Sequence, residues 1–155
     1  LDAFTKCDEI WHAGDIGSAE VLARLSSAKK LRAVSGNIDG PDVRGRVPDQ
    51  LSWTIEETDV WMTHIGGHPD RYEPGIENEL RARRPDVFVC GHSHIPRAVW
   101  DAKLRLVHLN PGACGHAGWH TRRTVMRFEV AAGEVNGIEL VDLGPRGRRS
   151  TNPRR

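Results

Sequence analysis

The sequence predicts an α/β domain in which two packed, mixed β-sheets are flanked by helices. In the first half of the chain, short apolar segments alternate with helical patterns, which is typical of βαβ units. In the second half, apolar segments follow one another across short polar turns, as they do in hairpins. The 155 residues suffice for one domain with a hydrophobic core, and 38% apolar with 28% charged residues is an ordinary globular composition.

The first half is expected to begin with a strand over 10–13. Ser18 is placed to cap a helix, because the apolar side chains that follow it recur on one helical face. A strand over 31–34 completes this βαβ unit, and segments 50–56 and 60–64 are then expected to pair as antiparallel strands.

The second half is dominated by hairpins. The elements expected there are a helix from Ile76 that ends before Pro85, a strand over 86–90, a hairpin of 97–100 with 104–109, and a last hairpin of 124–130 with 135–141. Residues 1–143 therefore form one expected domain. Residues 144–155 carry five arginines and no acidic residue, and this basic tail is expected to be disordered because it lacks apolar periodicity.

Five of the apolar segments run into tight turns with side chains that suit a metal site. These side chains are Asp15, Asn37, His64, the pair His92 and His94, and Asn110. Ligands of open α/β sheets lie beyond the carboxyl ends of the strands, so these side chains are expected to meet at one edge. A carboxylate can bridge two cations about 3.5–4 Å apart. Mixed imidazole and oxygen ligation predicts two divalent cations, Mn²⁺ first, with Fe²⁺, Co²⁺, Ni²⁺ or Zn²⁺ as alternatives.

The local spacing supports this site. Glycine precedes Asp15, Asn37 and His92, and it is expected to let the chain turn sharply where each strand ends. His92 and His94 alternate along the chain, so an extended segment would point both imidazoles the same way.

The ordered set of motifs resembles the calcineurin-like metallophosphoesterases. The motifs are Gly14-Asp15, Gly36-Asn37, His64 and Gly91-His92-Ser93-His94. Asn110-Pro111-Gly112 and the small size of the chain resemble the compact bacterial YfcE-like phosphodiesterase branch. The resemblance runs from about Cys7 to Leu143 and implies the four-layer sandwich of that superfamily.

The same resemblance implies roles for the site residues. Asp15 would bridge two metal ions, Asn37, His64 and His92 would complete one metal site, and His94 would belong to the other. Asn37, Asn110 and Gly112 would contact the substrate phosphate.

Two departures from the family pattern are visible. No Asp-x-His motif precedes Gly14-Asp15, so we expect the first strand to be missing and the sequence to be N-terminally incomplete. Many relatives carry a histidine directly after the motif asparagine, where it can protonate the leaving group, whereas this chain has Ile38. His68 is the candidate replacement acid, and His116 and His120 are further candidates for substrate contact.

The function expected from these residues is hydrolysis of phosphodiesters by a metal-bound hydroxide at a dinuclear site. The alternative is a non-catalytic protein-interaction scaffold of the same fold, similar to the retromer subunit, with a degenerate metal site. A nucleic-acid-binding role through the basic tail is a third interpretation, although a short basic tail is a weak signal.

The expected partner is a small phosphodiester rather than a nucleic acid or a membrane, and a homo-oligomer is compatible with the sequence. No stretch approaches the roughly 18 continuous apolar residues that a membrane span requires. The sequence shows no signal segment, and its three cysteines form no disulfide framework, so a cytoplasmic location is expected.

Overall fold

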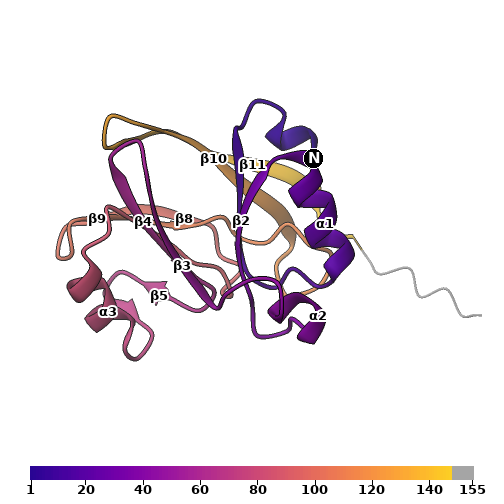
Figure 1. The fold of residues 1–155 in the computed structure, drawn as a ribbon, viewed down its shortest axis with the longest axis horizontal. Coiled ribbons are helices and arrows are strands. Elements are labelled where there is room, and N and C mark those ends of the chain that lie inside the picture. The colour runs from indigo at the N-terminus through magenta and orange to yellow at the C-terminus, as the bar shows by residue number, and fades with distance from the viewer. Residues whose placement is uncertain (148–155) are drawn as a thin grey trace, which may run out of the picture.

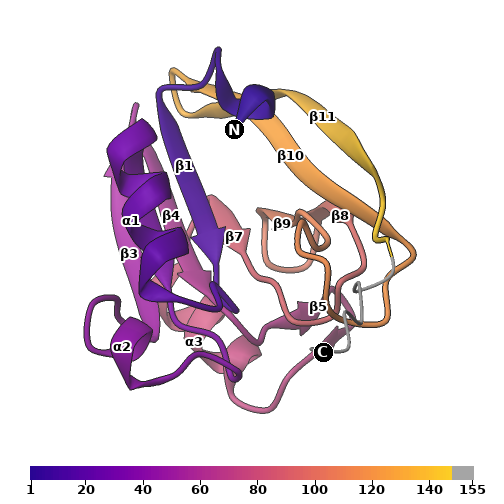
Figure 2. The same ribbon diagram turned by 90° about the vertical axis from the view of Figure 1, so that its right-hand side faces the viewer.

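Helices and sheets pack in the order helix, sheet, sheet, helix in the computed structural model, which describes residues 1–147 (Figures 1 and 2). Helices α1 (Ala19–Ala28) and α3 (Ile76–Arg83) lie at opposite ends of the fold in Figure 1. Between them lie one five-stranded sheet and two-stranded pairs, built mostly from short strands. The fold class predicted from the sequence, two packed sheets flanked by helices, is therefore confirmed.

The βαβ unit at the start of the chain forms as the sequence predicts. Strands β1 (Glu9–Ala13) and β2 (Lys30–Val34) pair in parallel, and α1 connects them. The Ser18 hydroxyl caps α1 by accepting a hydrogen bond from the backbone N–H of Val21 at 3.3 Å. A single helical turn, α2 (Pro41–Arg44), follows β2, and it is too short to show a periodic pattern in the sequence.

The larger sheet has five strands in the order β3-β4-β7-β9-β8. Their bounds are β3 Gln50–Ile55, β4 Thr58–Thr63, β7 Val87–Val89, β9 Leu106–Asn110 and β8 Arg97–Asp101. The central strands β4, β7 and β9 run parallel, whereas the two edge strands pair antiparallel to their neighbours. The sheet is therefore mixed, and the carboxyl ends of its three central strands meet at one edge.

The remaining elements are a long hairpin and several short pieces. The hairpin of β10 (Arg122–Ala131) and β11 (Glu134–Pro145) arches across the side opposite α1 in Figure 2. Strand β11 extends two residues into the segment expected to be a tail, and residues 148–155 of that segment lie outside the described residues. The short pieces are a 3-10 helix, η1 (Asp2–Phe4), and the strand pair β5 (Gly67–His68) with β6 (Arg71–Tyr72).

Three apolar clusters hold the layers together. The first lies between the sheets and consists of Ala13, Val34, Val60, Met62, Val87, Val89 and Leu109. The second lies between the large sheet and α3, and it contains Trp61, Phe88 and Leu80. The third joins α1 and α2 to β2 through Leu22, Val43 and Ala33. Because successive side chains of a strand point to opposite faces, Trp61 packs on one layer while Val60 and Met62 pack on the other.

A half-buried carboxylate clamps β1 to β2. The Glu9 side chain is 12% exposed and lies 2.6 Å from Lys30 Nζ and 2.7 Å from Arg32 Nε. Burial raises the pKa of Glu9, but the Arg32, Lys30 and Trp11 donors outweigh it and lower that pKa to about 2. Arg32 also lies 4.8 Å from the centroid of the Trp53 ring, so the clamp extends to the large sheet.

No helix among residues 1–147 is long and apolar enough to cross a membrane.

The Glu9 clamp predicts an acid-sensitive contribution to stability. Because folding lowers the pKa of Glu9, its contribution is complete above about pH 4.5 and is lost as the pH falls toward 2. Glu9→Gln should lower the free energy of unfolding by about 1–3 kcal/mol at pH 7, and the difference should shrink at pH 3. Urea denaturation at both pH values measures this. The exposed Glu134→Gln is the control, with a change under about 0.5 kcal/mol; an equal loss in both variants would contradict the clamp.

Candidate metal centre

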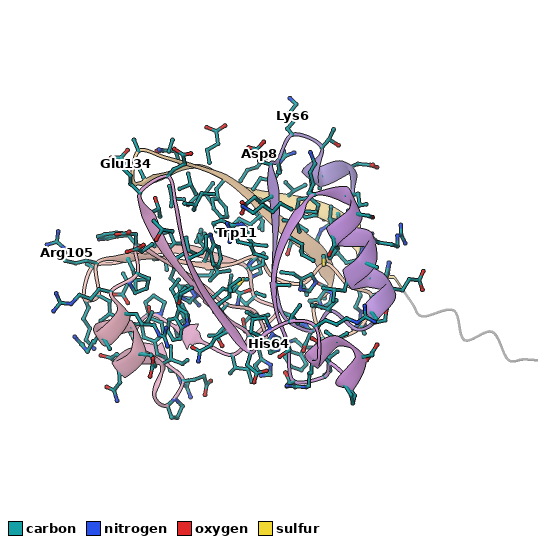
Figure 3. The ribbon with its side chains drawn as sticks, viewed as in Figure 1. Lys6, Asp8, Trp11, His64, Arg105 and Glu134 are labelled. Carbon is teal, nitrogen blue, oxygen red and sulfur yellow. The ribbon has the colours of Figure 1, made fainter. Side chains whose placement is uncertain are left out.

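The residues expected to bind metal come from four strand ends. Asp15 follows β1, Asn37 follows β2, His64 follows β4, and His92 and His94 follow β7. Figure 3 shows His64 at the lower edge of the strands, whereas Lys6 and Asp8 lie at the opposite end of the molecule. The site is therefore assembled from turns far apart in the sequence.

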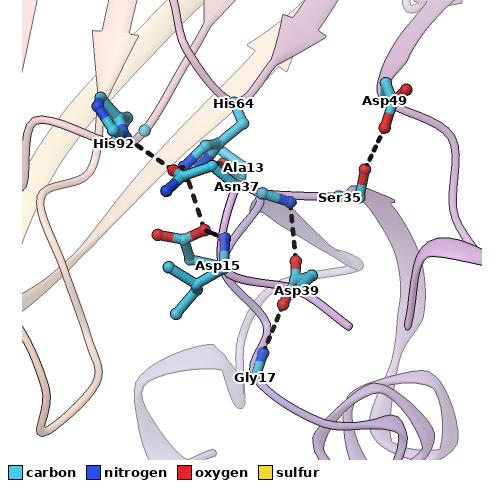
Figure 4. Close-up of polar contacts among 12 residues, drawn as sticks. Ala13, Asp15, Gly17, Ser35, Asn37, Asp39, Asp49, His64 and His92 are labelled. Atoms are coloured by element: carbon cyan, nitrogen blue, oxygen red, sulfur yellow. Dashed lines mark hydrogen bonds and ion pairs between the residues drawn. The ribbon is translucent and has the colours of Figure 1, made fainter. Parts of the chain in front are cut away.

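His64 is the best-defined member of the site. Its Nδ1–H donates to the Ala13 carbonyl oxygen at 2.7 Å, since that oxygen can only accept. The other ring nitrogen, Nε2, lies 2.9 Å from Asn37 Oδ1 and 3.2 Å from Asp15 Oδ1 (Figure 4). In the neutral ring Nε2 carries a lone pair, so three acceptor atoms face one another with no hydrogen between them. This donor set fits a divalent cation, which would relieve the mutual repulsion of the lone pairs.

His92 joins this set through Asn37. Its Nδ1 lies 3.0 Å from Asn37 Oδ1, and its ring centroid lies 5.2 Å from that of His64. No group of three or more His, Cys, Asp or Glu side chains within residues 1–147 is close enough to hold a metal by itself. The amide oxygen of Asn37 is therefore the central atom that connects the imidazoles and the carboxylate.

Three of the expected ligands have a strained backbone. Asp15, His92 and His94 have φ angles of +58°, +62° and +57°, in the left-handed region that non-glycine residues rarely adopt. The expectation of an extended segment through His92 and His94 is therefore wrong. Such strain persists only where the surrounding structure enforces it, and it concentrates at functional sites.

The glycines beside the ligands act mainly by allowing close approach. Gly14 has φ +91°, and a Cβ atom there would lie 2.4 Å from His64 Nδ1. At Gly36, whose φ is not in the left-handed region, a Cβ atom would lie 2.0 Å from Asp15 Oδ1. The expected sharp glycine turn is thus present at Gly14, while at His92 the histidine itself adopts the left-handed conformation.

Asp39 is a supporting residue that the sequence analysis missed. Its carboxylate is buried and accepts hydrogen bonds from the N–H groups of Gly17 at 2.7 Å and Gly36 at 2.8 Å. It thereby ties the turn of Asp15 to the turn of Asn37. Burial raises the pKa of Asp39, but these backbone donors outweigh burial and lower it. The available signal was its spacing, because an Asp two residues after a turn Asn can bond the neighbouring backbone.

Asn110 has a similar supporting position. Its side-chain N–H donates to the Gly91 carbonyl at 2.8 Å and to Ser93 Oγ at 3.1 Å, and its Oδ1 accepts from the N–H of Gly112 at 3.0 Å. The residue is 2% exposed, so its amide braces the turn that carries His92. The substrate contacts expected of Asn110 and Gly112 stay predictions.

Three further candidate histidines, His94, His68 and His116, make their side-chain hydrogen bonds to groups outside the Asp15–Asn37–His64–His92 set. His94 Nδ1 lies 3.1 Å from His120 Nδ1, so the two rings are within hydrogen-bonding distance. Burial lowers the pKa of His94, and the neighbouring His120 lowers it further. His68 Nδ1 contacts the Pro69 carbonyl at 2.8 Å, so its role as an acid stays a prediction. His116 contacts the Arg146 carbonyl at 2.6 Å and Arg123 at 3.1 Å.

The strand-end side chains and the layered fold agree with the class expected from the sequence, the metal-dependent phosphoesterases. Residues 1–133 match the calcineurin-like phosphoesterase superfamily domain, and the chain belongs to this family. It is similar to a probable metallophosphoesterase of Methanothermobacter thermautotrophicus, with 31% identity over 161 residues that cover 100% of this chain and 87% of the relative. Membership of the bacterial YfcE-like branch stays a prediction.

Solved structures show the same fold. An archaeal phosphodiesterase matches with a TM-score of 0.71 and 20% identity, over 92% of this chain and 88% of that one. Vps29 of Chaetomium thermophilum matches with a TM-score of 0.69 and 17% identity, over 91% and 84%. Membership of the metallophosphoesterase family implies that divalent metals are used.

The Asp39 brace predicts how its variants behave. Asp39→Ala leaves two backbone N–H groups without their acceptor and should cost about 1–3 kcal/mol of unfolding free energy at pH 7. Asp39→Asn keeps one acceptor oxygen and should cost less. Because folding lowers the pKa of Asp39, this contribution is complete above about pH 3.8 and is lost as the pH falls through the lower folded value.

Urea denaturation at pH 7 and in acid measures both effects. Asp8→Ala is the matched control, since Asp8 is exposed and lies at the end of the molecule opposite His64 (Figure 3). Equal stability of Asp39→Ala and Asp8→Ala would show that Asp39 does not brace the two turns.

Proposed function

We propose that this chain hydrolyses small phosphodiesters at a dinuclear metal site. The observation that supports this most directly is the convergence of acceptor atoms at His64, whose Nε2 lies 2.9 Å from Asn37 Oδ1 and 3.2 Å from Asp15 Oδ1. A folded protein with no bound cation gains nothing from facing three lone pairs at one point. The family membership of the chain supports the same activity.

The residues present divide into two metal positions, as the resemblance implies. Asp15, Asn37, His64 and His92 would hold one cation, and Asp15 with His94 would contribute to the other. When bound, the cations would neutralise the phosphoryl oxygens and activate the water that attacks phosphorus. Mn²⁺ is the first candidate, with Fe²⁺, Co²⁺, Ni²⁺ and Zn²⁺ as alternatives.

The side chains around the site suit an anionic ester. Asn37 is exposed, and its neutral amide adds no negative charge against the phosphate. His64 is 5% exposed, so it lies out of contact with bulk water. Ile38, which follows Asn37, is 65% exposed and cannot transfer a proton. We therefore propose that diesters with good leaving groups are the preferred substrates.

The test is metal content together with diesterase activity of the full chain. His92→Ala should lower Mn²⁺ content and reduce hydrolysis of bis(p-nitrophenyl) phosphate by at least about 100-fold, because it removes one ligand. Asp8→Ala is the control, since Asp8 is exposed and lies at the end of the molecule opposite His64 (Figure 3), and it should leave activity unchanged. Elemental analysis and the rate of nitrophenol release measure both. Full turnover by a folded His92→Ala protein would overturn the proposal.

The alternative function is a protein-interaction scaffold, which the shared fold of Vps29 permits. Exposed apolar side chains favour it: Trp100 is 58% exposed and Val99 is 37% exposed on the edge strand β8. A scaffold, however, has no chemical need for converging metal ligands. A folded chain that retains no metal after equilibration with Mn²⁺ would favour the scaffold.

A further inference from the structure

The loop between β9 and β10 lies against His94. Three consecutive loop residues surround its imidazole. Trp119 and His120 contact the ring, and Gly118 leaves room for it. None of them belongs to the motif set found in the sequence. Each contact restricts a different freedom of the His94 ring.

His120 restricts where the His94 ring carries its hydrogen. His120 Nε2 lies 3.0 Å from the Gly115 carbonyl oxygen, which can only accept, so Nε2 carries the hydrogen. In the neutral ring, His120 Nδ1 then carries a lone pair. His94 Nδ1 lies 3.1 Å from this lone pair and must donate, which leaves His94 Nε2 free as a ligand.

The same arrangement occurs at His64. Its Nδ1–H is held by the Ala13 carbonyl, and its Nε2 faces the acceptor atoms of the site. Ligating histidines usually donate their second N–H to a fixed acceptor, which sets the tautomer and the ring orientation. At His94 the acceptor is a buried histidine, since His120 is 8% exposed, backed by the Gly115 carbonyl.

Trp119 and Gly118 restrict the plane and the position of the ring. The Trp119 indole stacks on His94 with centroids 5.0 Å apart and an interplanar angle of 28°, and its Nε1–H donates to the Ser93 carbonyl at 3.2 Å. At Gly118, which has φ +119°, a Cβ atom would lie 2.4 Å from His94 Cε1. Any side chain at 118 would therefore push the imidazole out of place.

We infer that His120 is a positioning residue that holds His94 as the Nδ1–H tautomer and presents its Nε2 to a divalent cation. The inference rests on the proposed function only for the identity of the bound group, because the tautomer is a property of the metal-free chain. A competing arrangement has both rings binding one cation through Nδ1, since two ligand nitrogens of one metal also lie about 3 Å apart.

The test is the tautomer of His94, read by ¹H–¹⁵N NMR of the imidazole nitrogens in the metal-free full chain. The wild-type protein should show His94 protonated at Nδ1 and unprotonated at Nε2. His120→Ala should lose this preference, and its dissociation constant for Zn²⁺ should rise about 10- to 100-fold. His120→Asn offers a carbonyl oxygen to the same N–H, so it should restore the tautomer and most of the affinity. The exposed and distant Asp8→Ala should change neither.

Each result decides for or against the positioning role. An Nε2–H tautomer in the wild-type protein, or an unchanged tautomer in a folded His120→Ala protein, would overturn it. Loss of the Nδ1 proton of His94 on Zn²⁺ addition would overturn it in favour of direct ligation by His120. A chain with the expected tautomer that binds no metal would refute the proposed function while leaving the positioning of His94 by His120 intact.

Discussion

The hydrogen bond from His64 Nδ1 to the Ala13 carbonyl is the interaction on which the site depends. This 2.7 Å bond joins the end of β4 in the five-stranded sheet to the end of β1 in the β1-β2 pair, across 51 residues of sequence. Because it fixes the hydrogen on Nδ1, it turns Nε2 toward Asp15 and Asn37. The His64 carbonyl in turn accepts the N–H of Gly91 at 2.9 Å, which places the turn of His92 beside it.

The crowding at this junction explains its composition. Gly14 and Gly36 leave no room for a side chain, because Cβ atoms there would overlap His64 and Asp15. Three further side chains hydrogen-bond the backbone of this junction. Arg44 donates to the Gly36 carbonyl at 2.6 Å, Asp39 accepts from the N–H of Gly36, and Asn110 donates to the Gly91 carbonyl. The strained backbone at Asp15, His92 and His94 is stable because these contacts leave the turns no alternative. The helical turn α2 has a place in this scheme, since it carries Arg44.

The two candidate functions use different parts of the molecule. Catalysis would use the strand-end junction, where the polar atoms of Asp15, Asn37 and His64 converge. A scaffold would use the apolar edge of the large sheet around Trp100. These two regions lie toward opposite ends of the strands. Strands β8 and β9 are antiparallel, so Asn110 at the end of β9 pairs with Arg97 at the start of β8, whereas Asp101 at the end of β8 pairs with Leu106 at the start of β9.

The sequence by itself determined the order of the elements and the chemical types of the ligands. Hydrophobic period and turn residues are local properties, so the βαβ unit, the strand segments and the turns of Asp15, Asn37, His64 and His92 could be located from neighbouring residues alone. Only the tertiary structure decided which atoms meet and which residues support them. His120 reaches His94 across 26 residues, Asp39 reaches Gly17 across 22, and Asn110 reaches Gly91 across 19. No local pattern encodes these contacts, because they depend on how the two sheets and the β9–β10 loop pack around the strand ends.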